Sequence, residues 1–354
     1  MNEPKDPEIG VPDSRPRFAA RTEDWIHVRR SRRAIKSGKA PDVIPYIGYG
    51  STEWVRVLGR VLFLKPSTPE HSRLRADVAQ VQRVRGWRSF TSLHVPHHPV
   101  SVSIDGQLVT EVVADRGGVI DAIVPVSLSP GWHTITLQTA EGEPADTPIH
   151  VLDPASRFGV ISDVDDTILM TALPKPFVAA WNTFVLAEQA RAATPGMPVL
   201  LDHLLGAHPG APIVYLSTGA WNAAPTLTRF LARNLYPVGP LLLTDWGPTH
   251  DRWFRSGREH KQRELRRLAA EFPDMRWVLI GDDGQHDEQL YHEFSTEHPQ
   301  NVAAVAIRQL SIGEAVLAGG RSKAQLHRSV SGVPWVYGPD GATLQDELAA
   351  LGLV

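Results

Sequence analysis

The stretch from Phe158 to Met170 reads FGVISDVDDTILM. It opens with an apolar run of strand length, and three aspartates, Asp163, Asp165 and Asp166, follow within four positions. A short apolar run of this kind is typical of a strand that is buried on both faces. Carboxylates so close together repel one another unless a cation compensates them, so the cluster is costly as structure alone. The stretch therefore predicts a buried strand with a functional site at its carboxyl end.

Toward the C-terminus, the same rhythm of strand and helix repeats. Helical patterns such as Pro225–Leu235, with proline in its first turn, separate most of the apolar runs. Strands that alternate with helices in this way predict an α/β fold with a doubly wound parallel sheet, in which ligands bind at the carboxyl ends of the strands. The further predicted strands are Ile213–Ser217, Pro240–Thr244, Trp277–Gly281 and Val302–Ile307.

Toward the N-terminus, the hydrophobic period changes to two. Short alternating runs are separated by glycine and proline turns, which favours a small antiparallel β-sandwich. One helix is expected near His71–Arg83. We divide the chain into a basic, partly disordered arm (1–45), the β-sandwich (46–152) and the α/β domain (153–354). The predicted strands include Val100–Ile104, Leu108–Val113, Val119–Val124 and His133–Leu137.

The composition excludes several kinds of chemistry. The 354 residues contain no cysteine, so disulfides, thiolate metal sites and cysteine nucleophiles are impossible. With 36 basic and 39 acidic residues, the formal net charge is −3, and no nucleic-acid partner is expected. No signal peptide or transmembrane segment is recognisable, which predicts a cytoplasmic protein. The sequence does not indicate an oligomeric state.

A second acidic cluster follows another predicted strand. The residues after Trp277–Gly281 read Asp282-Asp283-Gly284-Gln285-His286-Asp287. Because the carboxyl ends of parallel strands meet at one edge of a sheet, both acidic clusters are expected there. Carboxylate oxygens in such a group suit Mg2+. The sequence therefore predicts a magnesium site.

Two further residues fit the same site. Ser217 ends a predicted strand and could donate to a phosphoryl oxygen, although capping of the following helix explains a serine equally well. Lys261 shares one helical stripe with the apolar Leu265 and Leu268, while arginines 263, 266 and 267 fall on the opposite side. Either the lysine reaches out to solvent from the first turn, or its ammonium neutralises phosphate and carboxylates at the site.

These pieces, in this order, resemble the four motifs of the haloacid dehalogenase superfamily of phosphatases. More closely, the chain resembles the actin-patch-protein type of phosphatidate phosphatase, which would extend the similarity over nearly its whole length. The stretches that carry the resemblance are IPYIGYGSTEWVRVLGRVL (44–62), DVDDTILMT (163–171), VYLSTGAW (214–221), EHK (259–261) and LIGDDGQHD (279–287).

The resemblance implies a covalent mechanism. Asp163 would be the nucleophile that forms an aspartyl-phosphate, and Asp165 would protonate the leaving group and then activate water. Ser217 and Lys261 would bind the phosphoryl oxygens, and Thr167 would orient the nucleophile loop.

The resemblance also implies the ligands of Mg2+. Asp163, the backbone carbonyl of Asp165, and Asp282 would hold the ion, with either Asp283 or Asp287 as a further ligand.

The substrate is expected to be a phosphorylated lipid at a membrane surface, which the protein contacts peripherally. The intervals between the motifs leave no room for a large cap domain, and the loop Asp245–Gly257 mixes tryptophan with arginine. Two alternatives stay open: a phosphatase of soluble or nucleic-acid phosphomonoesters, and a non-catalytic binding or scaffold protein. The histidines at 94, 97 and 98 are expected to form a proline-bounded loop rather than a metal site.

Overall fold

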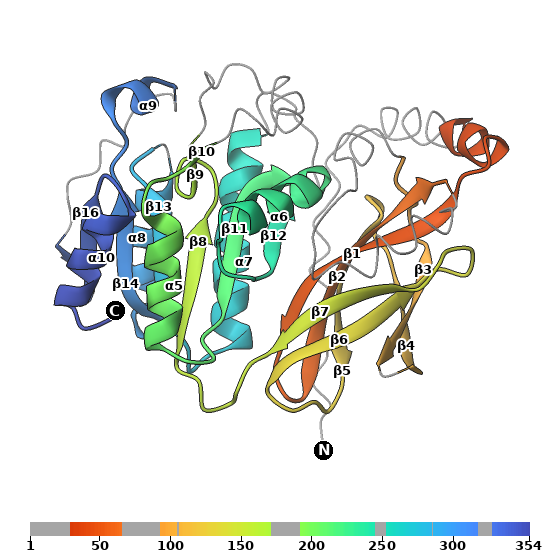
Figure 1. Ribbon diagram of the computed structural model, residues 1–354, viewed down its shortest axis with the longest axis horizontal. Helices are drawn as coiled ribbons and strands as arrows, with labels where there is room; N and C mark the ends of the chain where they lie inside the picture. Colours follow the sequence, from red (N-terminus) through yellow and green to blue (C-terminus); the bar gives the residue numbers. More distant parts are fainter. Residues whose placement is uncertain are drawn as a thin grey trace.

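The structure of the chain is a computed structural model. It describes residues 29–65, 93–104, 106–170, 192–244, 253–284, 286–317 and 328–354, with the backbone alone for 253–256 and 316–317. Two seven-stranded sheets lie side by side in Figure 1, joined by the segment between β7 and β8. A helix over residues 29–36 precedes the first sheet. The first strand begins at Ala40, so residues 40–45 of the predicted arm belong to the sheet.

The N-terminal sheet has the strand order β4-β3-β6-β7-β1-β2-β5. β1 and β7 run parallel, and every other neighbouring pair is antiparallel. The alternating pattern predicted most of these strands, whereas β1 and β7 were not predicted. The strands are β1 (Ala40–Gly50), β2 (Trp54–Leu64), β3 (Pro99–Ile104), β4 (Gln107–Val113), β5 (Val119–Pro125), β6 (Gly131–Gln138) and β7 (Ala145–Val151).

These seven strands form one continuous sheet rather than the two packed sheets of a sandwich. The edge strands β4 and β5 lie in contact, so the sheet curls around its own core. Valine, isoleucine and leucine side chains from both halves of the sheet fill that core. Alternation predicts which side chains point inward, but it does not distinguish one curled sheet from two packed ones. The predicted β-sandwich is therefore not confirmed.

The C-terminal sheet has the order β12-β11-β8-β13-β14-β16-β15 and is parallel except for the β15–β16 hairpin. From β8 the chain adds β11 and β12 on one side, then returns to add β13 on the other. The change of direction lies between β8 and β13, where open α/β sheets bind ligands. The strands are β8 (Phe158–Asp163), β11 (Ile213–Ala220), β12 (Leu241–Thr244), β13 (Arg276–Asp282), β14 (Val302–Arg308), β15 (Ser329–Val330) and β16 (Val333–Gly338).

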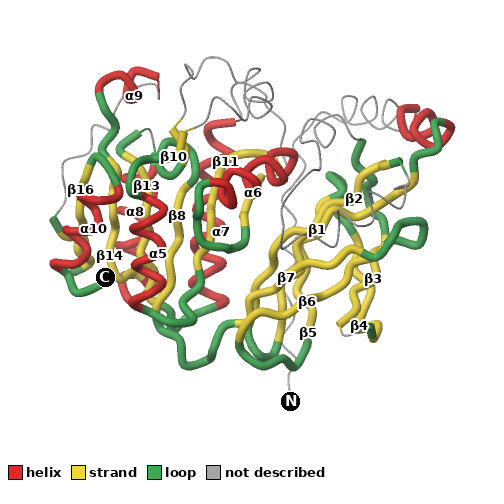
Figure 2. The backbone as a smooth tube through the Cα atoms, in the orientation of Figure 1, coloured by secondary structure: helices red, strands yellow, loops and turns green. Residues whose placement is uncertain are grey.

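Helices cover this sheet. Figure 1 shows α5 and α10 in front of the strands and α7 and α8 behind them, and Figure 2 shows the same layers. The α/β class is thereby confirmed, and the haloacid-dehalogenase-like arrangement stays a prediction. The other elements are α5 (Met197–Ala207), α6 (Ala224–Arg233), α7 (Trp253–Glu271), α8 (Asp287–Glu297), α9 (Ile312–Leu317), α10 (Gly341–Ala350), η3 (Trp221–Ala223), η4 (Pro299–Asn301), and the short strands β9 (Leu169–Met170) and β10 (Ala192–Ala193).

The two sheets share apolar contacts. Tyr46, Tyr49 and Leu58 of the N-terminal sheet belong to the same buried cluster as the core of the α/β sheet. The rings of Tyr49 and Phe272 lie 6.0 Å apart. Because the two parts pack against each other, the domain limits drawn from the sequence stay predictions.

Some expectations fall outside the described residues. These are the helix near His71–Arg83, the disordered start of the arm and the segment 245–252 of the aromatic loop. The rest of that loop's predicted range is helical, since α7 begins at Trp253. Among the residues that the structure describes, no helix is long and apolar enough to cross a membrane.

Candidate active site

The loop after β8 holds the first acidic cluster. Asp163 ends the strand and is only 2% exposed, while Asp165 is half-buried. The Thr167 hydroxyl donates to Asp163 Oδ2 at 3.1 Å and lies 3.3 Å from Asp282 Oδ2. Thr167 therefore links the loop after β8 to the end of β13.

A buried arginine fixes the shape of this loop. Asp166 adopts a left-handed backbone conformation with φ 61°, which is uncommon for a residue other than glycine. Arg308, at the end of β14, donates from Nη1 to the Asp166 carbonyl at 2.6 Å and from Nη2 to Glu314 Oε1 at 2.6 Å. These contacts hold the strained turn between Asp165 and Thr167.

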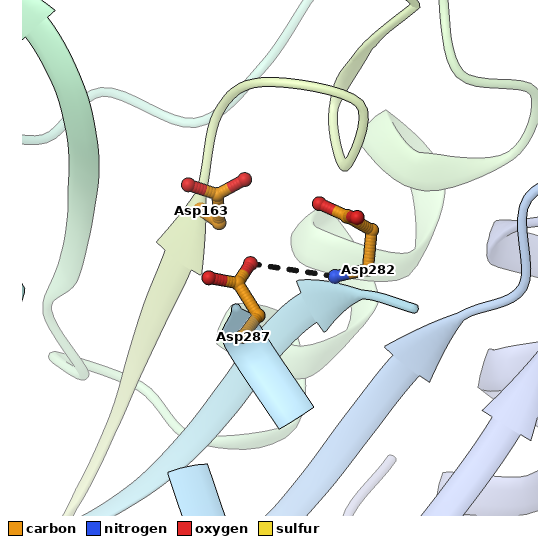
Figure 3. Close-up of side chains that lie close together, drawn as sticks. All are labelled: Asp163, Asp282 and Asp287. Carbon is orange, nitrogen blue, oxygen red and sulfur yellow. Dashed lines mark hydrogen bonds between the residues drawn. The ribbon is translucent and has the colours of Figure 1, made fainter. Parts of the chain in front are cut away.

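The second acidic cluster lies at the neighbouring strand end. Figure 3 shows Asp282, from β13, and Asp287, from the start of α8, beside Asp163. The Asp282 amide donates to Asp287 Oδ2 at 3.4 Å, and Asp282 Oδ1 accepts from the Gly284 amide at 2.6 Å. Gly281 lets α8 approach this closely, because a Cβ there would lie 2.7 Å from Asp287 Oδ2.

Asp283 faces a different part of the molecule. Its Oδ1 accepts from the Leu310 amide at 2.8 Å, and its own amide donates to the Arg308 carbonyl at 2.9 Å. These contacts attach the end of β13 to the loop after β14. Of the two candidates for the further metal ligand, the structure brings Asp287, and not Asp283, to Asp163 and Asp282.

Lys261 reaches the site from the side of the sheet that α7 covers. Its Nζ lies 2.6 Å from Asp163 Oδ1 and 2.6 Å from Asp287 Oδ1. The residue is 7% exposed, so its side chain does not extend to solvent. Burial alone would lower the pKa of Lys261, but the carboxylates of Asp163 and Asp287 outweigh it and raise that pKa well above its usual value. Lys261 is therefore an ammonium ion.

Ser217 completes the constellation from β11. Its hydroxyl donates to Asp165 Oδ2 at 2.9 Å and accepts from the Gly219 amide at 2.9 Å. The side chain thus faces the first acidic cluster. The helix α6 begins only at Ala224, and no side chain caps it, so helix capping does not explain this serine.

Asp163, Asp282, Asp287 and Lys261 form what we call the active-site cluster. One carboxylate oxygen from each aspartate lies within 4.8 Å of the others, and all three residues are buried. Burial, and next the carboxylate of Asp287, raise the pKa of Asp163 well above its ordinary value, although Lys261 acts in the opposite direction. One ammonium thus faces three carboxylates. The cluster therefore carries excess negative charge, which a divalent cation with oxygen ligands would neutralise.

Several structural residues of this region escaped the sequence reasoning. Arg308 was not singled out, although an arginine that ends a wholly apolar strand is an unusual pattern. The arginines opposite the apolar stripe of α7 do not all face solvent, because the side chain of Arg267 is only 19% exposed and bonds to Asp121 of the N-terminal sheet. Its spacing from Glu264 and Glu271, three and four residues away, was the available signal.

The expected histidine loop gains one unexpected contact. His98 Nε2 lies 3.1 Å from Glu141 Oε2, a partner that is 43 residues away in sequence. Among the described residues, the only group of three or more candidate ligands is the aspartate trio of the active-site cluster.

Comparison with known families bears directly on this site. Residues 158–309 match the family described as "Phosphatidate phosphatase APP1, catalytic domain". The predicted resemblance is confirmed. The matched segment begins with β8 and ends just after β14, so it contains every residue of the active-site cluster. The matched family is one of phosphatases, the enzyme class that the sequence predicted.

Two fungal relatives are similar over longer stretches. "Phosphatidate phosphatase APP1" of Saccharomyces cerevisiae is 24% identical over 253 residues, which cover 67% of this chain and 42% of that protein. An uncharacterized protein of Schizosaccharomyces pombe is 24% identical over 163 residues, 46% of this chain and 26% of that one. The chain thus spans less than half the length of the curated relatives it matches. The predicted α/β domain, residues 153–354, is shorter than two thirds of the chain. The alignment with the Saccharomyces cerevisiae protein, which covers 67% of the chain, therefore reaches into the N-terminal sheet.

Similarity to solved structures is weak. A carbohydrate acetylesterase from Xanthomonas citri is 14% identical, with coverage of 86% of this chain and 72% of that one, and a TM-score of 0.29. A score this low supports no statement about fold or function.

Proposed function

We propose that the chain is a Mg2+-dependent phosphatase that hydrolyses a phosphomonoester through an aspartyl-phosphate on Asp163, with phosphatidate at a membrane surface as its substrate. The observation that supports this most directly is the meeting of Asp163, Lys261 and Asp287 at one strand end, inside the segment that matches the phosphatidate phosphatase family. Acidic residues are common on protein surfaces, whereas a buried ammonium between two buried carboxylates is rare in proteins.

The first chemical step uses Asp163 and Asp165. An Oδ atom of Asp163 attacks phosphorus, the bond from phosphorus to the substrate oxygen breaks, and that oxygen takes a proton from Asp165. Asp165 suits this exchange because it is the less buried of the two and its Oδ2 accepts from Ser217. The products of this step are the free alcohol, diacylglycerol for phosphatidate, and a phosphorylated Asp163.

The second step restores the enzyme. Asp165, now a carboxylate, takes a proton from water while the water oxygen attacks phosphorus and the bond to Asp163 breaks. Inorganic phosphate leaves, Asp163 is again a carboxylate, and Asp165 again carries its proton. Atoms and charges balance over the two steps.

Two side chains meet the charge on the phosphoryl oxygens. Lys261 is an ammonium at 2.6 Å from Asp163 Oδ1, so it lies beside the phosphorus that Asp163 attacks. Ser217 offers a hydroxyl from the adjacent strand end. Charge in a loose phosphoryl-transfer transition state spreads over the equatorial oxygens, where fixed donors stabilise it most.

The residues present fit Mg2+. The oxygens of Asp163, Asp282 and Asp287 would hold the ion together with the backbone carbonyl of Asp165, and Asp283 is turned to the Leu310 amide. When bound, Mg2+ supplies positive charge that favours the ionised form of Asp163 and attracts phosphoryl oxygens. An all-oxygen donor set without histidine or cysteine is the set that this ion prefers.

The test compares presentations of the substrate. Wild-type protein is incubated with phosphatidate vesicles and, separately, with a soluble phosphomonoester, each with Mg2+ or with EDTA, and phosphate release is measured. We expect release from vesicles that requires Mg2+ and disappears in Asp163→Asn. Good hydrolysis of the soluble ester with none from vesicles would overturn the lipid assignment. No release from either substrate would favour a non-catalytic protein.

A further inference from the structure

The helix that carries Lys261 is held from two sides. Leu265 and Leu268 on one side of α7 are fully buried in the α/β domain. Another side faces the N-terminal sheet, where Arg267 Nη1 donates to Asp121 Oδ2 at 2.9 Å and the Tyr49 hydroxyl donates to Glu271 Oε2 at 2.8 Å. The first sheet thus contacts the helix on which the proposed phosphate-binding ammonium sits.

Arg56 of β2 is the central residue of this contact. Its side chain is 10% exposed, and its Nε donates to Glu271 Oε1 at 3.1 Å. Its Nη2 also reaches Glu271, while its Nη1 donates to Asp121 of β5. A planar guanidinium that bonds two carboxylates fixes their relative positions as well as holding them together. We call Arg56, Asp121, Glu264, Arg267 and Glu271 the interface cluster.

A second contact reaches the strand that bears Ser217. Tyr46 stacks on Trp221 with the ring centroids 4.9 Å apart, and its hydroxyl donates to the Trp221 carbonyl. Arg60 donates to the Asn222 side chain. Both Trp221 and Asn222 lie in η3, which directly follows β11. The β1–β2 hairpin therefore touches the supports of both proposed phosphate-binding side chains.

We propose that Arg56 is a positioning residue for Lys261, so that the N-terminal sheet is part of the catalytic unit; this inference rests on the proposed function. Apolar packing alone does not fix the position of α7 along or about its own axis, because such contacts are not directional. That position depends on the polar contacts of α7, which reach α8 on one side and the N-terminal sheet on another. The ion pairs with Arg56 are directional and lie less than three helical turns from Lys261. Displacement of a catalytic group by about 1 Å can cost roughly 100-fold in rate.

Substitution of Arg56 by methionine tests the inference while preserving the fold. In Arg56→Met, Asp121 keeps Arg267 and Glu271 keeps the Tyr49 hydroxyl, so neither carboxylate loses its last partner. The matched control is Arg266→Met. Arg266 lies on the same helix and pairs with Glu297 of α8 at 2.8 Å, within the α/β domain and away from the N-terminal sheet.

Activity on the substrate that wild type hydrolyses is measured for both variants, alone and combined with Lys261→Ala. We expect Arg56→Met to lower kcat roughly tenfold and Arg266→Met to leave it unchanged. Because Arg56 acts through Lys261, Arg56→Met should cause no further loss in the Lys261→Ala protein. Unchanged kcat in Arg56→Met, or a full tenfold further loss without Lys261, would overturn the inference.

A readout that needs no activity separates this inference from the proposed function. Wild-type protein that releases no phosphate would refute the proposed function, and amide hydrogen exchange then decides the positioning role. Amides of α7 around Lys261 should exchange severalfold faster in Arg56→Met than in wild type, and at the wild-type rate in Arg266→Met. Equal rates in all three proteins would overturn the inference.

Discussion

The helix α7 takes part in two groups of charges, which differ in the balance between positive and negative side chains. In the active-site cluster one ammonium faces three carboxylates, and burial together with neighbouring carboxylates raises the pKa of Asp163. In the interface cluster two guanidinium groups face three carboxylates. Burial there would raise the pKa of Asp121, but Arg267 and Arg56 outweigh it and lower that pKa. The active-site cluster, with its excess of carboxylates, is thus where a cation and a phosphate are expected. The interface cluster, in which positive and negative charges are nearly equal in number, instead connects α7 to the N-terminal sheet.

The largest difference between the two clusters is expected for the substitution Asp163→Asn in the active-site cluster. The change removes the proposed nucleophile, so phosphate release should fall by roughly 10,000-fold or more. The same change relieves repulsion between Asp163 and Asp287, so without metal the free energy of unfolding should rise by about 1 kcal/mol. Phosphate release and urea unfolding in EDTA check the two effects. A large loss of stability would mean that the carboxylates of the cluster are already compensated.

The next largest effect is expected from Mg2+ binding to the active-site cluster. At a Mg2+ concentration about 100 times its Kd, binding to the native state alone should raise the free energy of unfolding by about 2.7 kcal/mol. Asp282→Asn should remove most of this gain. Asp283→Asn is the matched control, since its side chain oxygen can still accept from the Leu310 amide. Thermal unfolding with Mg2+ or EDTA measures both, and equal loss in the two variants would contradict the ligand assignment.

The pH dependence of stability tests a residue between the two clusters. Burial, and next the charge of Arg263, lower the pKa of His260 to about 3. Because the native pKa lies below the unfolded value of about 6.5, the unfolded chain takes up the proton first as the pH falls. This one residue should reduce the free energy of unfolding by about 2 kcal/mol between pH 7.5 and pH 5.

Replacement of His260 by glutamine isolates that contribution. His260→Gln has no titratable group at this position, so its stability should fall less steeply over the same range of pH. Urea unfolding at several pH values gives the two slopes. Parallel slopes for wild type and variant would show that the imidazole titrates equally in both states.

The smallest effect is expected at the surface. Arg266 and Glu297 form a bidentate ion pair, but their side chains are 50% and 44% exposed. Exposed pairs of this kind contribute roughly 0 to 1 kcal/mol, so Arg266→Met should change the free energy of unfolding by less than about 1 kcal/mol. Chemical unfolding checks this. A loss of several kcal/mol would mean that exposure does not separate this pair from the interface cluster.

Much of the α/β domain was predictable, because its signals are local. Each apolar run predicted for this domain is a strand of the C-terminal sheet, and Asp163, Ser217 and Asp282 lie at or near the carboxyl ends of three of these strands. Parallel strands with connecting helices leave few topologies, so Asp163, Ser217 and Asp282 had to meet at one edge. The burial of Lys261 followed from its place on the apolar stripe of its helix.

The parts that were missed depend on partners that are distant in sequence. Whether Asp283 or Asp287 joins the site depends on the loop after β14, which takes up the Asp283 carboxylate. Arg267 is spaced like a residue on the solvent side, and only the arrival of Asp121 from β5 makes that side an interface. Alternation in the N-terminal strands likewise does not reveal that β4 and β5 meet. Periodicity describes one element, and these features belong to pairs of elements.

The β1–β2 hairpin is synthesised well before the residues that it contacts in the α/β domain. Arg56 precedes its partner Glu271 by 215 residues, so the hairpin leaves the ribosome long before the helix that completes its charged face. Until then Tyr46 and Tyr49 present aromatic surface to water. Conversely, a fragment limited to 158–309 would expose Trp221 and the interface side of α7. We therefore expect such a fragment to aggregate during expression, while a chain that begins before β1 folds to a monodisperse product.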